Sequence, residues 1–168
     1  MSKRVFPAIC MASLMVLASC GGGGEAADPN AGADVLPNGM TVRAQIEARQ
    51  EGYKTLGKNF KTINDQLKTS EPDLGEIETA IAAMLETSGG MADWYPEGTG
   101  PESGVETEAL AVIWENPEGF AVKIADYEGA LAGLNTAIQS GDFEAIGLAA
   151  RATGATCGGC HDDFRLDD

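Results

Sequence analysis

The sequence predicts an all-α protein, an up-down antiparallel four-helix bundle with one long loop between the second and third helices. Three observations predict this fold. Four stretches place apolar residues three or four positions apart, the spacing that gathers them on one face of a helix. No stretch of the sequence sustains the alternation of apolar and polar residues that marks a strand. The connections between the stretches are short except for one, which is typical of antiparallel bundles.

The first two predicted helices each carry a cap residue and an apolar face. The first begins at Thr41, a side chain that suits a helix N-cap, and ends before Pro72. The second begins at Asp73 with Glu76 three residues later, as in a capping box, and Gly89-Gly90 ends it. The apolar face of the first consists of Val42, Ile46, Tyr53, Leu56, Phe60, Ile63 and Leu67. That of the second consists of Leu74, Ile77, Ile81, Met84 and Leu85.

The long loop and the last two helices follow. Residues 91 to about 107 contain several glycines and prolines, so we expect an irregular but packed loop. The third helix is predicted to run to about residue 140, with Asn116 as its cap and Pro117 at its first position. The fourth is predicted over residues 143–164, with Asp142 as its cap. The third helix also contains glycines that weaken it or permit close helix contact: Gly119, Gly129 and Gly133.

The N-terminus is predicted to be an export signal. Residues 1–19 read as a lipoprotein signal peptide, because a positive start precedes an apolar run too short to span a membrane. The run closes on Leu17-Ala18-Ser19-Cys20, which resembles a bacterial lipobox with Cys20 as the lipidated residue. An ordinary secretory signal cut nearby is the alternative. Residues 20–40, rich in Gly, Ala, Asp and Pro, are expected to be the lipidated cysteine and a flexible tether, followed by the bundle over residues 41–168.

The expected location follows from the residue after the lipobox. Position 21 is Gly and not Asp, which by resemblance to proteobacterial sorting rules favours the outer membrane over the inner membrane. We therefore expect a lipid-anchored protein on the periplasmic side of the bacterial envelope. The formal net charge of −15 argues against a nucleic-acid partner, since a phosphate backbone requires clustered Lys and Arg. An acidic surface instead favours an encounter with a basic or membrane-bound partner.

The end of the fourth helix carries Cys157-Gly158-Gly159-Cys160-His161, the pattern of c-type haem attachment. Cysteines three apart lie on one side of a helix, where both can form thioethers with the vinyl groups of one porphyrin. The histidine that follows then serves as the proximal iron ligand. We therefore predict one covalent haem c with its iron.

Three other interpretations of the motif are weaker. A thioredoxin-like redox pair requires a preceding strand, and none is predicted here. A zinc site requires two more ligands, but His161 is the only histidine and Cys10 and Cys20 belong to the export segment. A structural disulfide leaves the histidine unexplained. The sixth iron position has no second histidine, and Met40, Met84 and Met91 fit core or loop packing better than ligation. The haem is thus expected to be five-coordinate, with one face open to a diatomic gas.

The chain after the tether resembles cytochrome c′, the class II c-type cytochromes. The resemblance rests on three stretches: Arg49 to Gly57 in the first helix, Thr107 to Trp114 before the third, and Cys157 to Arg165 at the end. The position of the haem motif matters most, because class I cytochromes carry it near the N-terminus. The family implies the four-helix fold and a homodimer as a candidate assembly, since many members pair through their first two helices.

The resemblance also implies a role for each matching residue. Cys157 and Cys160 would form the thioethers, His161 would be the proximal ligand, and Arg165 would be the basic residue beside it. Tyr53 would cover the open iron face, where low-spin relatives carry methionine. For Tyr53 the alternative is plain core packing, and for Arg165 a cation near a helix C-terminus.

Four further residues match segments that surround the haem in this family. Arg49 and Gln50 would face the haem edge and its propionates, and the alternative is that both are solvated surface. Thr107 and Glu108 would meet the haem from the loop, and the alternative is a simple helix cap.

The expected function is electron transfer with redox partner proteins of the envelope. Binding of nitric oxide or carbon monoxide, for buffering or protection, is the alternative. Peroxidase-type chemistry is disfavoured because no distal histidine is present to move protons, so we do not expect an enzyme.

Overall fold

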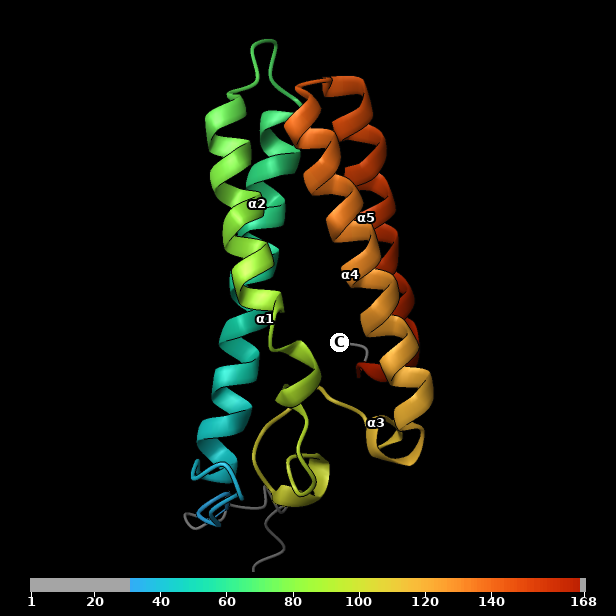
Figure 1. The fold of residues 1–168 in the computed structure, drawn as a ribbon. Coiled ribbons are helices and arrows are strands. Elements are labelled where there is room, and N and C mark those ends of the chain that lie inside the picture. The colour runs from blue at the N-terminus through green and yellow to red at the C-terminus, as the bar shows by residue number, and fades with distance from the viewer. Residues whose placement is uncertain (1–30, 167–168) are drawn as a thin grey trace, which may run out of the picture.

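The computed structural model describes residues 31–166 and contains four long helices. They are α1 (Val42–Gln66), α2 (Leu74–Ser88), α4 (Pro117–Ser140) and α5 (Phe143–Phe164). Figure 1 shows α1 beside α2 and α4 beside α5, each pair antiparallel, so the molecule is a bundle of two helical hairpins. The predicted all-α, four-helix fold is confirmed.

The long connection between α2 and α4 is folded rather than merely irregular. It contains two 3₁₀ turns, η1 (Met91–Trp94) and η2 (Pro101–Ser103), and one helical turn, α3 (Val112–Glu115), which the sequence did not predict. These pieces gather at the end of the bundle where α1 begins and α5 ends (Figure 1). The end of the fourth helix, which carries the haem motif, therefore lies beside the loop.

The helices begin at the residues that the sequence predicts. Thr41, Asp73, Asn116 and Asp142 each accept a hydrogen bond from a backbone N–H of the first turn that follows. Such caps satisfy donors that have no partner inside the helix. The capping box of α2 differs from the prediction, because the Asp73 N–H donates to Gln66 at 2.9 Å instead of to Glu76. Gln66 in turn donates to Glu76, so the end of α1 helps to start α2.

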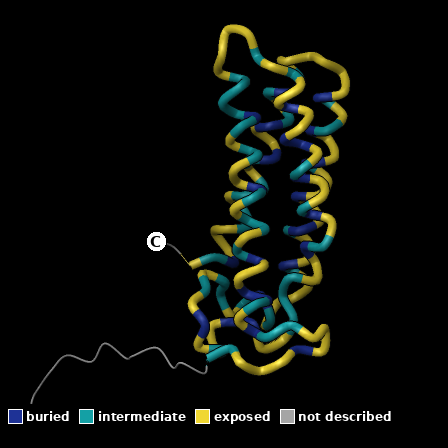
Figure 2. The backbone as a smooth tube through the Cα atoms, turned by 90° about the vertical axis from the view of Figure 1, so that its left-hand side faces the viewer, coloured by how far each residue is buried: buried dark blue, intermediate teal, exposed yellow. Residues whose placement is uncertain are grey.

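The core is formed by residues of all four long helices. Figure 2 shows the buried segments of the backbone turned toward the interior of the bundle. Leu85 departs from the prediction, since its side chain is 37% exposed. Ile77, Ile81 and Met84 follow one stripe, and Leu85 lies one residue, or about 100°, beyond it. The most completely buried large apolar side chains are Ile46, Ile63, Ile77, Met84, Leu131, Leu134, Ile138 and Ile146.

Residues 31–40, the last part of the predicted flexible tether, are folded against the start of α1. Val35 forms a bridge with Thr41, and Leu36 packs with Val42, Ile46 and Val105 in a small second cluster. The tether prediction was therefore wrong for residues 31–40, because Leu36 supplies apolar surface that Val105 of the loop covers, while Val35 stays exposed. The predicted signal peptide and Cys20 lie outside the described residues. None of the described helices is long and apolar enough to span a membrane.

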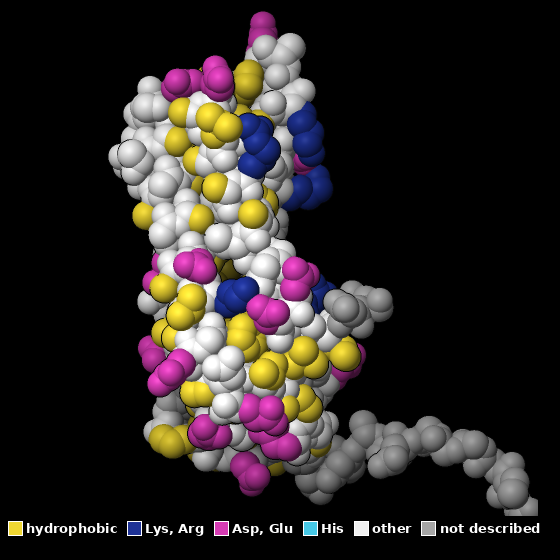
Figure 3. Space-filling view, turned by 90° about the vertical axis from the view of Figure 1, so that its right-hand side faces the viewer, with side chains coloured by type: hydrophobic (Ala, Val, Ile, Leu, Met, Phe, Trp, Pro, Cys, Tyr) yellow, Lys and Arg dark blue, Asp and Glu magenta, His cyan; other side chains and the backbone are white. Residues whose placement is uncertain are grey.

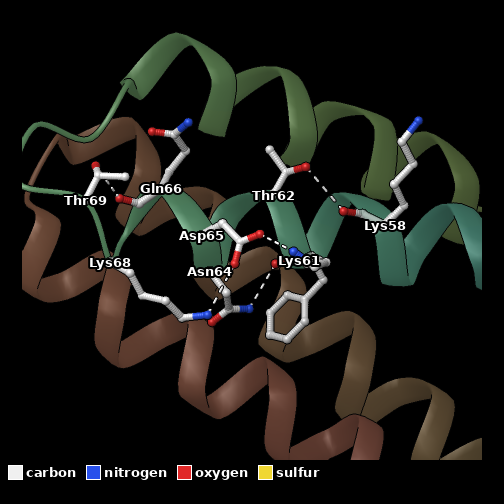
Figure 4. A network of polar contacts seen from close by, with 9 residues as sticks. Lys58, Lys61, Thr62, Asn64, Asp65, Gln66, Lys68 and Thr69 are labelled. Atoms are coloured by element: carbon white, nitrogen blue, oxygen red, sulfur yellow. Dashed lines mark hydrogen bonds and ion pairs between the residues drawn. The ribbon is translucent and has the colours of Figure 1, made fainter.

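The outer face of α1 carries a short network of exposed polar contacts (Figure 4). Asp65 pairs with both Lys61 and Lys68, and the Asn64 side chain donates to the Phe60 carbonyl at 2.9 Å. Pairs this exposed contribute little to stability. The network identifies this side of α1 as a solvent-facing, lysine-bearing surface.

The surroundings of two glycines of α4 show whether they permit a close contact with another helix or only weaken their own helix. A Cβ built at Gly129 or Gly133 has no heavy atom within 4 Å, so neither glycine permits a close helix approach. We expect Gly129→Ala and Gly133→Ala each to raise the free energy of unfolding by up to about 1 kcal/mol, because alanine restricts the unfolded chain and favours the helix. Denaturant unfolding of the holoprotein measures the change.

Gly52 in α1 is the matched control, since a Cβ there would lie 2.5 Å from the Trp94 ring. We expect Gly52→Ala to destabilise the protein despite the same gain in helix propensity. Equal stabilisation at all three positions would contradict this explanation.

Candidate functional site

The last two turns of α5 position the haem motif. Helix α5 continues through Cys157 and Cys160, and both thiols are unpaired, half-buried and packed against the main core. The Cys157 thiol contacts the Thr153 carbonyl at 3.5 Å. Burial raises the pKa of both thiols. Two neighbouring thiols on the inner side of one helix fit the double attachment that the motif predicts.

His161 follows in the last turn of α5 as an exposed residue, where the end of the helix is joined to the loop. The Arg165 N–H donates to the His161 carbonyl at 3.1 Å, and the Arg165 guanidinium forms an ion pair with Glu108 at 2.6 Å. Partial burial, and secondly the charge of Arg165, lower the pKa of the imidazole. The structure thus brings together three residues that the sequence singled out: His161, Arg165 and Glu108.

Backbone hydrogen bonds reinforce this junction. The Leu110 N–H donates to the Phe164 carbonyl at 3.1 Å, and the Leu166 N–H donates to the Glu108 carbonyl at 2.8 Å. Glu108 therefore binds the end of the fourth helix rather than capping the next one. The alternative interpretation of this residue as a simple helix cap is wrong.

Arg49 is buried inside the loop, with a side chain only 3% exposed. Its guanidinium donates to the Thr99 carbonyl and to the Thr107 hydroxyl, each at 3.0 Å, and to the Trp94 carbonyl at 3.4 Å. It also lies 4.5 Å from the centre of the Tyr95 ring. Burial lowers the pKa of Arg49. Arg49 is thus not a solvated surface residue, and it joins α1 to the loop.

Gln50, which the family resemblance places with Arg49 at the haem edge, is more exposed than Arg49. Its amide donates to the Glu106 carbonyl at 3.1 Å in an exposed position. Together, Arg49 and Gln50 bind the loop segment that contains Thr107. The Thr107 hydroxyl accepts from Arg49 and also from the Ala109 N–H at 3.2 Å.

Tyr53 of α1 is partly buried against the main core, and its side chain contacts two loop residues. Its hydroxyl is hydrogen-bonded to the Tyr95 hydroxyl at 2.9 Å, and its ring meets Trp94 edge-on with centroids 5.1 Å apart. Burial raises the pKa of Tyr53 strongly, the neighbouring Tyr95 adds to the rise, and the Cys160 thiol adds a smaller part. Tyr53 of α1 and Cys160 of α5 both pack against the main core cluster.

Sequence reasoning missed two other contacts around this interior. Tyr95, beside Trp94 in the loop, joins Tyr53 to Arg49; the only sequence signal was an aromatic pair in a segment rich in glycine and proline. Lys123 of α4 donates to the Gly159 carbonyl at 2.8 Å and pairs with Asp163 at 2.8 Å. Lys123 thus binds α4 to the haem motif, a contact between helices that no sequence spacing predicts.

One buried polar atom bears on whether a cofactor fits here. Within residues 31–166, the Tyr127 hydroxyl is the buried side-chain oxygen that lacks a hydrogen-bond partner. Its pKa is raised by burial and by the nearby Cys157. A buried donor without a partner, beside an unpaired thiol, suits an interior that another group completes. Among the described residues, no cluster of His, Cys, Asp and Glu side chains forms a metal site of the zinc type.

Known proteins match this arrangement over most of the chain. The family model for cytochrome C′ matches residues 44–165. A cytochrome c′ of Pararhodospirillum photometricum is 37% identical over 129 residues, spanning 73% of this chain and 96% of the relative. The crystal structure of cytochrome c′ from Thermochromatium tepidum matches with a TM-score of 0.70 at 27% identity, covering 76% of this chain and 98% of that one. Another solved cytochrome c′, described as showing ligand-controlled dimer dissociation, matches with a TM-score of 0.71 at 27% identity, covering 77% and 99%.

Arg49 allows a direct test of how the loop is held. We expect Arg49→Ala to lower the free energy of unfolding by about 3 kcal/mol, because the hydroxyls of Thr99 and Thr107 and two backbone carbonyls each lose one donor. Amide hydrogen exchange in residues 94–107 should accelerate, since these residues lose their link to α1.

Arg151 is the matched control, an exposed arginine on α5. We expect Arg151→Ala to change the free energy of unfolding by less than about 0.5 kcal/mol. If Arg49→Ala behaved like Arg151→Ala in both measurements, the assignment of Arg49 as the link between α1 and the loop would be wrong.

Proposed function

Because this chain belongs to the cytochrome c′ family, whose members carry a covalently attached haem c, we propose that it transfers single electrons in the bacterial cell envelope. The observation that carries the proposal is the pair of unpaired, half-buried thiols followed by His161, at the point where α5 meets the core. The haem supplies the one-electron chemistry when bound. The chain supplies attachment, orientation and shielding from water.

Each predicted site residue has a part in this proposal. Cys157 and Cys160 hold the porphyrin through thioethers, and His161 is the proximal iron ligand. Arg165 beside His161 places a positive charge next to the iron ligand, and its ion pair with Glu108 fixes that charge in place. Such charges and hydrogen bonds near an axial ligand are means by which a protein tunes a reduction potential.

The side of the site next to the loop is formed by residues that join α1 to the loop. We propose that Arg49, Gln50 and Thr107 hold the loop against α1 and keep this edge of the haem covered. The buried Arg49 and its bonds to Thr99 and Thr107 support this role.

We propose that the iron is five-coordinate, with Tyr53 on the open face. His161 is the only histidine of the sequence, so a second one cannot bind. Met84 and Met91 are buried in the main core cluster, which suits packing. Tyr53 packs against the same core cluster as Cys160, which supports its placement across the interior from the motif.

The surface charge favours a basic partner at the haem end. Figure 3 shows acidic side chains spread over the lower half of the view, with basic side chains among them near mid-height, and a further basic group in the upper half below acidic side chains at the top. Four of the eleven Lys and Arg residues of the sequence are Lys54, Lys58, Lys61 and Lys68 of α1 and the turn that follows it. An acidic surface steers the approach of a basic redox protein and raises its association rate at low salt.

The location and assembly are part of the same proposal. We propose that Cys20 is lipidated and anchors the protein to a membrane on the periplasmic side, with the outer membrane favoured over the inner membrane. A homodimer through α1 and α2 is also proposed, since a related cytochrome c′ is described by its dimer dissociation. No nucleic-acid partner is proposed.

Binding of nitric oxide or carbon monoxide is the second candidate function. One observation favours it: the bulky side chain of Tyr53 is held by Tyr95 and Trp94. On the proposed open iron face it would exclude large ligands and would have to move for small ones. We do not propose peroxidase chemistry, because no second histidine is present to act as an acid–base catalyst.

Electron transfer predicts a specific response to salt. The purified holoprotein should be reduced and reoxidised reversibly by a basic redox partner, with a bimolecular rate that falls by about tenfold as ionic strength rises from about 10 to about 200 mM. Stopped-flow spectroscopy measures the rate. A reduction potential outside the respiratory range would contradict the proposal, and a rate that rises with salt would contradict the acidic encounter surface.

Five-coordination predicts a particular spectrum and a role for Tyr53. The oxidised and reduced holoprotein should show high-spin absorption spectra, and carbon monoxide should shift the reduced one. Tyr53→Ala should bind carbon monoxide faster, because the side chain that covers the iron is removed. A low-spin spectrum of the methionine type would contradict the open face, and an unchanged rate would remove Tyr53 from it.

A further inference from the structure

We propose that Tyr95 is a positioning residue that holds Tyr53 over the iron and thereby limits the rate at which small ligands bind. The inference rests on the proposed open iron face with Tyr53 beside it. Its basis is the hydrogen bond between the two hydroxyls, which lie 2.9 Å apart. This bond joins the predicted distal side chain of α1 to a loop residue that no sequence motif includes.

Tyr95 is the fixed partner of the pair. Its ring lies 4.5 Å from the Arg49 guanidinium and meets Phe120 edge-on with centroids 4.7 Å apart. Its backbone carbonyl accepts a hydrogen bond from the Trp114 indole at 3.1 Å. Three different elements therefore hold Tyr95: α1, α3 and α4.

Tyr53 is the partner that must move. Apart from its hydrogen bond to Tyr95, its ring is restrained by the edge of Trp94, whose centroid lies 5.1 Å away. Trp94 is seated against the backbone of α1 at Gly52, where a Cβ would lie only 2.5 Å from the indole. A rotation of Tyr53 away from the iron face breaks the bond to Tyr95 and the contact with Trp94, so both loop residues raise the barrier to ligand entry.

The substitution Tyr95→Phe removes the hydroxyl and keeps the ring in place between Arg49 and Phe120. A neutral hydrogen bond of ordinary strength corresponds to a factor of about three to ten in an equilibrium or a rate. We therefore expect the association rate of carbon monoxide with the reduced holoprotein to rise about three- to tenfold in Tyr95→Phe. Flash photolysis measures this rate.

A double-mutant cycle separates positioning from general loosening of the loop. Tyr53→Phe should also accelerate binding, and adding Tyr95→Phe to it should produce no further acceleration, because the bond is already lost. Tyr127→Phe is the control: it removes a buried hydroxyl that is not bonded to Tyr53, so its effect should be the same in both backgrounds. Denaturant unfolding of the same variants should show coupling between Tyr53 and Tyr95 and none between Tyr53 and Tyr127.

The outcomes distinguish this inference from the proposed function. If Tyr53→Ala leaves the carbon monoxide rate unchanged, Tyr53 does not cover the iron face, and both the distal assignment and the role of Tyr95 are wrong. If Tyr53→Ala accelerates binding while Tyr95→Phe does not, the distal assignment stands and the role of Tyr95 is overturned. Independent, multiplicative effects of Tyr53→Phe and Tyr95→Phe on the rate would also overturn it.

Discussion

The buried guanidinium of Arg49 is the interaction on which the functional end of the bundle depends. A charged group with a side chain 3% exposed is costly unless its donors are satisfied. Here the acceptors are Thr99, Thr107 and the carbonyl of Trp94, all in the loop between α2 and α4. The loop must therefore fold around the side chain, and the helix that carries Arg49 becomes its template.

The loop that folds around Arg49 contacts the surroundings of the haem motif on two sides. Through Trp94 and Tyr95, the loop contacts Tyr53 and so shapes the interior on the side of α1. Through Glu108, it pairs with Arg165 and holds the end of α5, four residues beyond His161. The two sides of the proposed haem site are therefore set by one loop, whose buried hydrogen bonds to α1 come from Arg49. Loops held by a rigid scaffold are common places for function, and this bundle provides that scaffold.

Helix positions were predictable because their determinants are local. Thr41, Asp73, Asn116 and Asp142 act as caps within a few residues of where they stand in the chain. The predictions failed where distant segments decide the outcome. Residues 31–40 fold because Leu36 packs with Val105 of the distant loop. Leu85 failed for a local reason instead, since it lies beyond the buried stripe of its own helix. The short helix α3 was missed because a single turn leaves almost no periodic pattern to detect.

The sequence by itself determined the helical fold, the haem motif of Cys157, Cys160 and His161 at the end of the fourth helix, and the family, because motif spacing and helix periodicity are properties of neighbouring residues. Only the tertiary structure decided that Arg49 is buried, that Glu108 pairs with Arg165, and that Tyr95 joins Tyr53 to the loop. These contacts join residues 42 to 58 positions apart. Pairings at such separations depend on how whole elements pack, and no local pattern in one sequence specifies them.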